Sequence, residues 1–434
     1  MKYTALVAGA RGVIGTNLIR HLSMLPDWNI IALSRSGAPR ENGFAKGPLM
    51  GNPVEEPYAA VHSVTANSVE APHAIGHSVT VNSDEDTHAM GRSAAVNSIK
   101  DPHAIGHSVT ANSVEDPHAI GHSSTGNPIR HIAVDLLDAD EARERLGALS
   151  DVTHIFYAAY QDKPTWVELV SPNLAMLTHL VEAIEPIAPG LQHISLMQGY
   201  KVYGAHYGPF KTPAKESDAG HMPPEFNLDQ QQYLERKQEG KAWSWSAMRP
   251  SVVGGTAPGN PMNLALLIAV YASISKELGL PLRFPGKPGA YDKLMEMTDA
   301  DLLAHATVWA ATEPRCANQA FNINNGDLFR WNEMWPKIAA WFDMPVGAPL
   351  HLPLQTIMVD KAPLWQQMQS KYALAPHRYE QMAAWPFGDF VLSWDYDFFA
   401  DGSKARRYGF YEFVDTEQMF YSLFEQFRAQ KIIP

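Results

Sequence analysis

The chain reads Thr4-Ala5-Leu6-Val7-Ala8-Gly9-Ala10-Arg11-Gly12-Val13-Ile14-Gly15 near its start, and this stretch decides the fold. An apolar run of strand length leads into three glycines with the spacing GxxGxxG, and an amphipathic stretch, residues 12–24, follows. In such a unit the first glycine makes the tight turn, the second lets the backbone approach a pyrophosphate, and the third lets the helix pack against the strand. The stretch therefore predicts a dinucleotide site at the helix N-terminus, formed by Gly9, Arg11, Gly12, Val13, Ile14 and Gly15.

Apolar runs of strand length alternate with amphipathic stretches over the first 250 residues. The predicted strands are 4–8, 29–33, 131–134, 154–158, 193–196 and 244–248. The predicted helices between them include 12–24, 139–149 and 173–187. This alternation predicts an α/β fold, a Rossmann-type doubly wound parallel sheet that binds its ligand at the carboxyl ends of the strands.

One segment interrupts the predicted Rossmann domain, which we expect over residues 1–255. Residues 40–129 form an insertion of low complexity, and from about residue 60 the chain repeats itself every 15 residues. The repeat lacks large aromatic residues, so we expect it to be mostly disordered, with a small solenoid as the alternative. It also creates histidine pairs such as His103 and His107, but these come with the repeat, and we expect no metal site.

The composition becomes aromatic after residue 250, where seven of the 11 tryptophans lie. We expect residues 256–434 to form a smaller, mainly helical lobe that binds the substrate. Its most apolar stretch, Leu264 to Ile274, is shorter than the roughly 20 residues needed to span a bilayer and predicts a core helix.

The bulk numbers limit the classes of function. A net charge of −12 argues against a nucleic-acid partner, which would need a basic surface. The single cysteine, Cys316, excludes an internal disulfide and fits a reducing compartment. The apolar run at the N-terminus is too short for a signal peptide. We expect a cytoplasmic protein without a membrane segment, and the oligomeric state stays open, with a homodimer as one option.

The second predicted strand ends in Ala32-Leu33-Ser34-Arg35-Ser36. Enzymes that use NAD usually place an acidic residue here for the ribose 2′-hydroxyl, whereas arginine suits a 2′-phosphate. Arg35 offers a permanently charged, planar group and Ser34 a hydroxyl, so the sequence favours NADPH/NADP. Arg11 could supply a second phosphate contact.

Further cofactor contacts follow from position along the predicted sheet. Asp135 and Leu136 come after the third strand, where an acidic residue can meet the adenine amino group. Small residues, Ala158 and Ala159, end the fourth strand and leave room for the cofactor. The other expected contacts lie at the ends of the fifth and sixth strands, at Gln198, Lys201, Pro250, Val252 and Val253.

Several ordered motifs resemble one enzyme family. The segments 192–204 and 248–254 look like the extended short-chain dehydrogenase/reductase pattern. A closer resemblance, to the progesterone 5β-reductase/iridoid synthase family, rests on 151–157, Lys201 with 208–210, 282–286, 298–303, 320–327 and 385–389. It covers roughly 300 residues, almost the whole chain outside the insertion.

That resemblance implies NADPH-dependent reduction of the C=C bond of an α,β-unsaturated carbonyl compound. Hydride goes to the β-carbon, and the enzyme must stabilise an enolate oxygen with preorganised donors. The family uses a tyrosine for this, supported by a lysine that Lys201 matches. The family's Phe-Tyr-Tyr segment falls on Phe226-Asn227-Leu228, so Asn227 replaces a tyrosine and could donate an amide N–H instead. Tyr203 and Tyr233 are alternative donors.

Two pocket residues are also implied by the resemblance, Tyr160 after the fourth strand and Phe398 late in the chain. The main hypothesis is thus an NADPH-dependent reductase of the C=C or C=O bond of a small carbonyl compound. The alternatives are a catalytically weak NADP-binding sensor or paralogue, and a sugar-nucleotide epimerase or dehydratase. The last class would place a tyrosine at 227 with a lysine four residues later, and Gln231 stands there instead.

Overall fold

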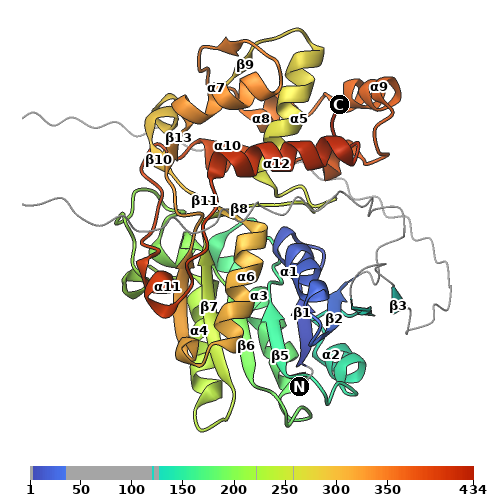
Figure 1. Ribbon diagram of the computed structural model, residues 1–434, viewed down its shortest axis with the longest axis vertical. Coiled ribbons are helices and arrows are strands. Elements are labelled where there is room, and N and C mark those ends of the chain that lie inside the picture. The colour runs from blue at the N-terminus through green and yellow to red at the C-terminus, as the bar shows by residue number, and fades with distance from the viewer. Residues whose placement is uncertain (1–2, 36–119, 122–126, 221, 258) are drawn as a thin grey trace, which may run out of the picture. The chain divides into compact units, whose positions relative to one another are not determined.

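The computed structural model describes residues 3–35, 120–121, 127–220, 222–257 and 259–434 (Figure 1). Nearly all of the predicted insertion 40–129, with its repeats and histidine pairs, lies outside these residues. Every described residue belongs to one compact unit.

A sheet with the strand order β12-β7-β6-β5-β1-β2-β4-β3 forms the centre of this unit. Seven of its strands are parallel: β1 (Tyr3–Ala8), β2 (Trp28–Ser34), β4 (Ile129–Ala133), β5 (His154–Tyr157), β6 (His193–Met197), β7 (Ser244–Pro250) and β12 (Gln319–Ile323). The short β3 (Ile120–Gly121) runs antiparallel to β4. The strand order reverses between β1 and β5, which is the point where doubly wound sheets bind ligands. The predicted fold class is confirmed.

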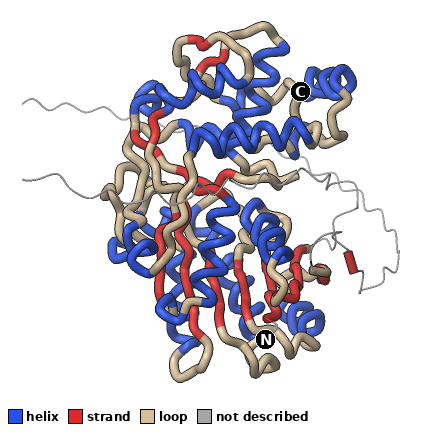
Figure 2. Tube along the Cα trace, viewed as in Figure 1, coloured by secondary structure: helices blue, strands red, loops and turns tan. Residues whose placement is uncertain are grey.

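Helices cover both faces of the sheet because the strands alternate their side chains between two apolar cores (Figures 1 and 2). Ala5 and Val7 of β1 point to the core beneath α1 (Val13–Met24) and α6 (Ala300–Thr312). Leu6 and Ala8 point to the opposite core, beneath α2 (Ala139–Leu146), α3 (Trp166–Ile184) and α4 (Phe226–Gln238). The sheet is therefore buried on both sides, as parallel sheets normally are.

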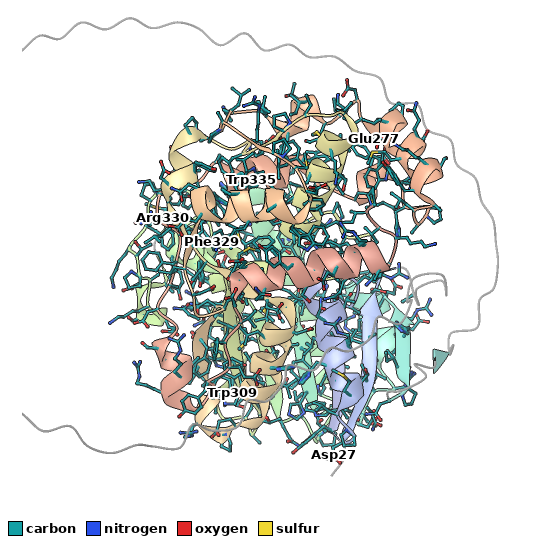
Figure 3. The ribbon with its side chains drawn as sticks, turned by 45° about the horizontal axis from the view of Figure 1, so that its top comes forward. Asp27, Glu277, Trp309, Phe329, Arg330 and Trp335 are labelled. Atoms are coloured by element: carbon teal, nitrogen blue, oxygen red, sulfur yellow. The ribbon has the colours of Figure 1, made fainter. Side chains whose placement is uncertain are left out.

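Helix α11 (Ser403–Tyr408) packs beside β12 at the edge of the central sheet. The other helices surround an aromatic core in the C-terminal part of the chain. They are α5 (Leu264–Glu277), α7 (Trp331–Trp341), α8 (Leu354–Ile357), α9 (Ala362–Tyr372), α10 (Trp385–Leu392) and α12 (Thr416–Ala429). Three two-stranded pairs connect them: β8 (Val252–Gly254) with β11 (Met297–Asp299), β9 (Leu282–Arg283) with β14 (Val346–Gly347), and β10 (Leu294–Met295) with β13 (Phe329–Arg330). Phe329 and Trp335 lie in this aromatic core, whereas Trp309 of α6 packs on β12 (Figure 3).

Two elements differ from the prediction, and one agrees closely. Helix α3 begins at Trp166, seven residues before the predicted start, because a capping box of Thr165 and Glu168 opens it and Pro172 is accommodated inside. Strand β12 was not predicted, although it lies directly beside β7. Helix α5 is buried on all sides from Leu264 to Ser275, as expected of a core helix.

Gly15 should not tolerate a methyl group. A Cβ atom at this position would lie 2.2 Å from the carbonyl oxygen of Gly9, whereas one at Gly190 would lie 3.9 Å from its nearest neighbour, in Thr153. Overpacking typically costs about 1–3 kcal/mol. We expect Gly15→Ala to lower the free energy of unfolding by this amount in urea titrations, and Gly190→Ala to change it by much less. Equal effects of the two substitutions would contradict the packing argument.

Candidate active site

The glycine turn is held tightly between two parallel strands. Gly9 has φ +83°, and a Cβ atom there would lie 2.4 Å from the carbonyl oxygen of Ala158, at the end of β5. The Gly12 N–H donates to the Gly9 carbonyl at 3.0 Å, and Ala158 N–H donates to Ala8. The turn therefore lies against the carboxyl end of β5, and only residues without a side chain fit at Gly9 and Gly15.

The N-terminus of α1 has the form of an anion site. Gly12 is its N-cap and has no side chain that could cap the helix amides. A Cβ atom at Gly12 would meet nothing closer than 3.4 Å, so this backbone is not pressed against its neighbours as Gly9 is. Val13 is buried and Ile14 packs on the core, so these two residues can offer a ligand only their backbone N–H groups. The residues present fit a bound pyrophosphate.

Cationic side chains gather at the carboxyl end of β2. Ser34 ends this strand, and Arg35 follows in an exposed turn. Arg11 is exposed as well. The pKa of His131, on the adjacent strand β4, is lowered mainly by the burial of His131 and in addition by the positive charge of Arg11. The two arginines thus come from the two segments that flank the predicted 2′-phosphate position.

The predicted adenine contacts are placed differently from one another. The Asp135 carboxylate accepts the Leu137 N–H at 3.0 Å, which fixes the turn after β4. Leu136 is buried in the core beneath α2 and α3, and its carbonyl is hydrogen-bonded with His179. Only the backbone of Leu136 could therefore reach a ligand.

The ends of β6 and β7 bring further predicted residues together. A Cβ atom at Gly199 would lie 3.6 Å from the carbonyl oxygen of Pro250. Val252 packs on the aromatic core, and Val253 packs beside Val13 at the start of α1. Ala159 is half-buried against the core beneath α3. These positions all lie at the carboxyl edge of the sheet.

Lys201 lies in a 3-10 turn, Tyr200–Tyr203, directly after β6. Its Nζ atom is 4.9 Å from the ring centroid of Trp166 and 5.6 Å from that of Tyr160. Burial lowers the pKa of Lys201, and the negative charges of Glu225 and Asp162 partly offset this. The ammonium group is therefore surrounded by two aromatic rings and two carboxylates. Trp166, Asp162 and Glu225 were not predicted from the sequence.

Asn227 lies beside Lys201 but is anchored to a carboxylate. Glu225 is the N-cap of α4 and accepts hydrogen bonds from the Asn227 backbone N–H at 3.3 Å, from the Asn227 amide Nδ2, and from the Leu228 N–H at 3.0 Å. Burial raises the pKa of Glu225. One N–H group of the Asn227 amide therefore donates to Glu225 and is not available to a ligand. An N-cap acid before Phe226 is a signal that the sequence did carry.

The two tyrosines considered as alternative donors lie elsewhere. The Tyr203 hydroxyl donates to Asn322 Oδ1 and accepts from Arg249. Tyr233 packs against the core beneath α3. Burial raises the pKa of its hydroxyl, and the negative charges of Glu182 and Glu185 raise it further. Glu182, which acts on Tyr233, and Trp166, which contacts Lys201, are 16 residues apart on α3, and this spacing corresponds to about 24 Å along a helix. Among the described residues, neither tyrosine is one of the aromatic or charged groups found around the Lys201 ammonium.

A buried arginine connects the three elements around the site. The Arg249 side chain, 1% exposed, donates through Nε to Gln198 Oε1 at 2.8 Å and through Nη2 to Gln231 Oε1 at 3.1 Å. Gln198 in turn donates to the Asn227 carbonyl at 2.8 Å. This network ties the ends of β6 and β7 to the first turn of α4, so the predicted cofactor residue Gln198 is already fully engaged in it.

The two predicted substrate residues are placed apart. Tyr160 is half-buried beside Lys201, and its hydroxyl donates to Asp162 Oδ1 at 2.8 Å. Phe398 is buried in the aromatic core, stacked on Trp394 with ring centroids 3.9 Å apart. Its ring centroid also lies 5.5 Å from that of Tyr200, the residue before Lys201.

No metal centre or membrane helix is found in the part of the chain that the structure describes. Within it, no group of three or more His, Cys, Asp or Glu side chains is arranged to hold a metal ion. None of its helices is both long and apolar enough to cross a bilayer.

The sheet order, the glycine turn and the lysine after β6 define a class, the Rossmann-fold proteins of the extended short-chain dehydrogenase/reductase type. Residues 127–434 match the family model of the PRISE-like Rossmann-fold domain. The chain belongs to this family, and the predicted resemblance is confirmed.

Curated relatives carry enzyme names. An (S)-8-oxocitronellyl enol synthase of Nepeta cataria is 34% identical over 318 residues, covering 71% of this chain and 81% of the relative. A 3-oxo-Δ(4,5)-steroid 5β-reductase of Arabidopsis thaliana is 33% identical over 316 residues, with the same coverage. Among solved structures, the UDP-glucose 4-epimerase of Thermus thermophilus, crystallised with NAD, aligns with a TM-score of 0.57 at 13% identity over 98% of this chain and 99% of that one. This last likeness supports the fold.

A buried carboxyl group next to the site predicts a specific pH dependence. Glu296, between β10 and β11, accepts hydrogen bonds from the Tyr200 hydroxyl and, at 2.8 Å, from the Ala400 N–H. Burial raises its pKa from 4.5 to about 8. Because the pKa is higher in the folded chain, this group stabilises the fold fully below pH 4.5, and that contribution is lost as the pH rises through 8.

Glu296→Gln keeps both acceptor contacts without the ionisation. We expect its free energy of unfolding, relative to the native chain, to rise by on the order of 1 kcal/mol per pH unit between about pH 5 and 8. Denaturant titrations at several pH values measure this, with Glu239→Gln, at an exposed carboxyl, as the control. Parallel pH curves for Glu296→Gln and the native chain would contradict the assignment.

Proposed function

We propose that the protein is an NADPH-dependent oxidoreductase that reduces the C=C bond, or the C=O bond, of a small α,β-unsaturated carbonyl compound. The observation that carries this proposal is Lys201, a half-buried cation at the end of β6, on the same sheet edge as the glycine turn. The names of the two plant relatives, an enol synthase and a steroid 5β-reductase, support the substrate class.

The glycine turn would hold the diphosphate of the dinucleotide through the backbone amides at Gly12, Val13 and Ile14. Arg35, with Ser34 and Arg11, would bind the 2′-phosphate, and this is why NADPH is preferred over NADH. Pro250 and Val252 would lie near the nicotinamide, which supplies a hydride when the cofactor is bound.

Lys201 would bind the nicotinamide ribose and contribute positive charge near the reacting carbonyl. Its position over two aromatic rings, close to Glu225 and Asp162, holds the ammonium in a defined place, and among the described residues it forms no direct ion pair. A positive charge in such a partly desolvated setting stabilises a developing enolate more strongly than it would in water.

We also propose that residues 256–434 bind the apolar part of the substrate, because their core is rich in aromatic side chains. The single cysteine is buried and the net charge is −12, which supports a cytoplasmic protein that does not act on nucleic acid. We also propose that the protein forms a homodimer.

A lysine pair tests the function. We expect the native chain to oxidise NADPH in the presence of small enones, followed by NADPH absorbance, and Lys201→Gln to lower kcat at least about 100-fold. The control is Lys211→Gln, since Lys211 bonds to Asp218 and completes only a formal YxxxK pattern with Tyr207. If the native chain binds NADPH yet turns over no enone or aldehyde, the sensor alternative replaces this proposal.

The cofactor preference has its own test. The exposed Arg35 guanidinium would make charge-assisted bonds to a 2′-phosphate, worth about 1.5–3 kcal/mol. Arg35→Ala should therefore raise the Kd for NADPH by roughly 10- to 100-fold, by fluorescence titration, and leave the Kd for NADH unchanged. NADH serves as the internal control, because it lacks the phosphate. An equal loss of both cofactors would contradict the role of Arg35.

A further inference from the structure

The missing tyrosine leaves the enolate oxygen without an obvious hydroxyl donor. Asn227 uses one of its two amide N–H donors on Glu225. The tyrosines of the 3-10 turn after β6 are buried, Tyr200 at 3% and Tyr203 at 4% exposure, and their hydroxyls donate inward to Glu296 and Asn322. Tyr207 is exposed and donates weakly to the Pro224 carbonyl at 3.4 Å. A phenol for this reaction must therefore come from another segment.

Tyr160 brings a phenol to the same place from β5. Its ring lies 5.9 Å, centroid to centroid, from that of Phe226, the residue directly before Asn227. The Lys201 Nζ atom lies 5.6 Å from the Tyr160 ring. The ring thus lies close both to the first turn of α4 and to the lysine.

The Tyr160 hydroxyl is also kept in the state that a donor needs. Burial, with the neighbouring Asp162 carboxylate, raises the pKa of this phenol, so it stays protonated at neutral pH. Its single proton is directed at Asp162 Oδ1, 2.8 Å away, which fixes the ring. An enolate is a stronger base than a carboxylate, so a bound enolate would compete for this proton by a rotation of the O–H bond alone.

We propose that Tyr160 is the oxyanion donor of this enzyme, supplying from the end of β5 the hydroxyl that position 227 lacks. The inference rests on the proposed reductase function. NADPH would be oxidised to NADP⁺ as its hydride forms a C–H bond at the β-carbon, and the C=C electron pair would move to form the enolate. The Tyr160 O–H bonds to the enolate oxygen, and a proton from water completes the saturated carbonyl compound at the α-carbon.

Two variants separate this role from a structural one. Tyr160→Phe keeps the ring contacts with Phe226 and Lys201 and removes only the hydroxyl. Tyr233→Phe is the matched control, because among the described residues the Tyr233 hydroxyl finds no hydrogen-bond partner. We expect Tyr160→Phe to lower kcat for enone reduction roughly 100-fold, with the Kd for NADPH and the Tm unchanged, and Tyr233→Phe to retain the native kcat.

A second measurement does not depend on turnover. In the NADP⁺ complex, 4-nitrophenolate carries a delocalised oxyanion like that of an enolate, and its absorption band reports hydrogen bonding to the oxygen. We expect Tyr160→Phe to weaken its binding roughly tenfold and to remove the band shift seen with the native chain.

The proposal is overturned if kcat is unchanged in Tyr160→Phe, or if it falls together with NADPH affinity. It is also overturned if the native chain and Tyr160→Phe bind 4-nitrophenolate equally or not at all. A native chain that binds the phenolate through Tyr160 but reduces no enone would instead count against the reductase function alone.

Discussion

The close stacking of Gly9 against the end of β5 is the constraint on which the rest of the site depends. A side chain at Gly9 would collide with the Ala158 carbonyl, and one at Gly15 would collide with Gly9 itself. This stacking sets the N-terminus of α1 at the point where the strand order reverses. It also fixes the start of the segment after β5, because Ala158 is only two residues before Tyr160. Tyr160 therefore lies close in the chain to the contact with the glycine turn.

The lysine site is assembled around this frame by segments that are far apart in the sequence. Lys201 comes from the turn after β6, while its neighbours come from the loop after β5, the start of α3 and the start of α4. Arg249, at the end of β7, ties the turn after β6 to α4 through neutral acceptors, so its hydrogen bonds do not use the carboxylates near Lys201. The result is a cation that, within the described part of the chain, has no direct ion pair and lies near the edge where we expect a nicotinamide ring.

The sequence predicts the frame well because its signals are local. The strand at 4–8, the glycine spacing and the apolar run from Leu264 each determine a nearby structure. Strand β12 was not predicted, because Gln319–Ile323 mixes polar and apolar residues. It also pairs with β7, which lies about 70 residues earlier along the chain, so no local signal marks it. The neighbours of Lys201 were not predicted, because Trp166 and Glu225 are far from it in the sequence and come close to it only in the folded chain. A capping pattern does mark the starts of α3 and α4, where these two residues lie. The sequence shows an asparagine at position 227, but its bond to Glu225 depends on side-chain geometry that the sequence does not carry.

Calorimetric titration with NADPH tests most directly whether the turn at the start of α1 binds the cofactor. Gly12 is the informative position, because a side chain there meets no close neighbour in the fold yet would project where the diphosphate is expected. We expect saturable heat from the native chain and none from Gly12→Glu, whose unfolding curve should match that of the native chain. Equal binding by both chains, or no heat from the native chain with either NADPH or NADH, would contradict it.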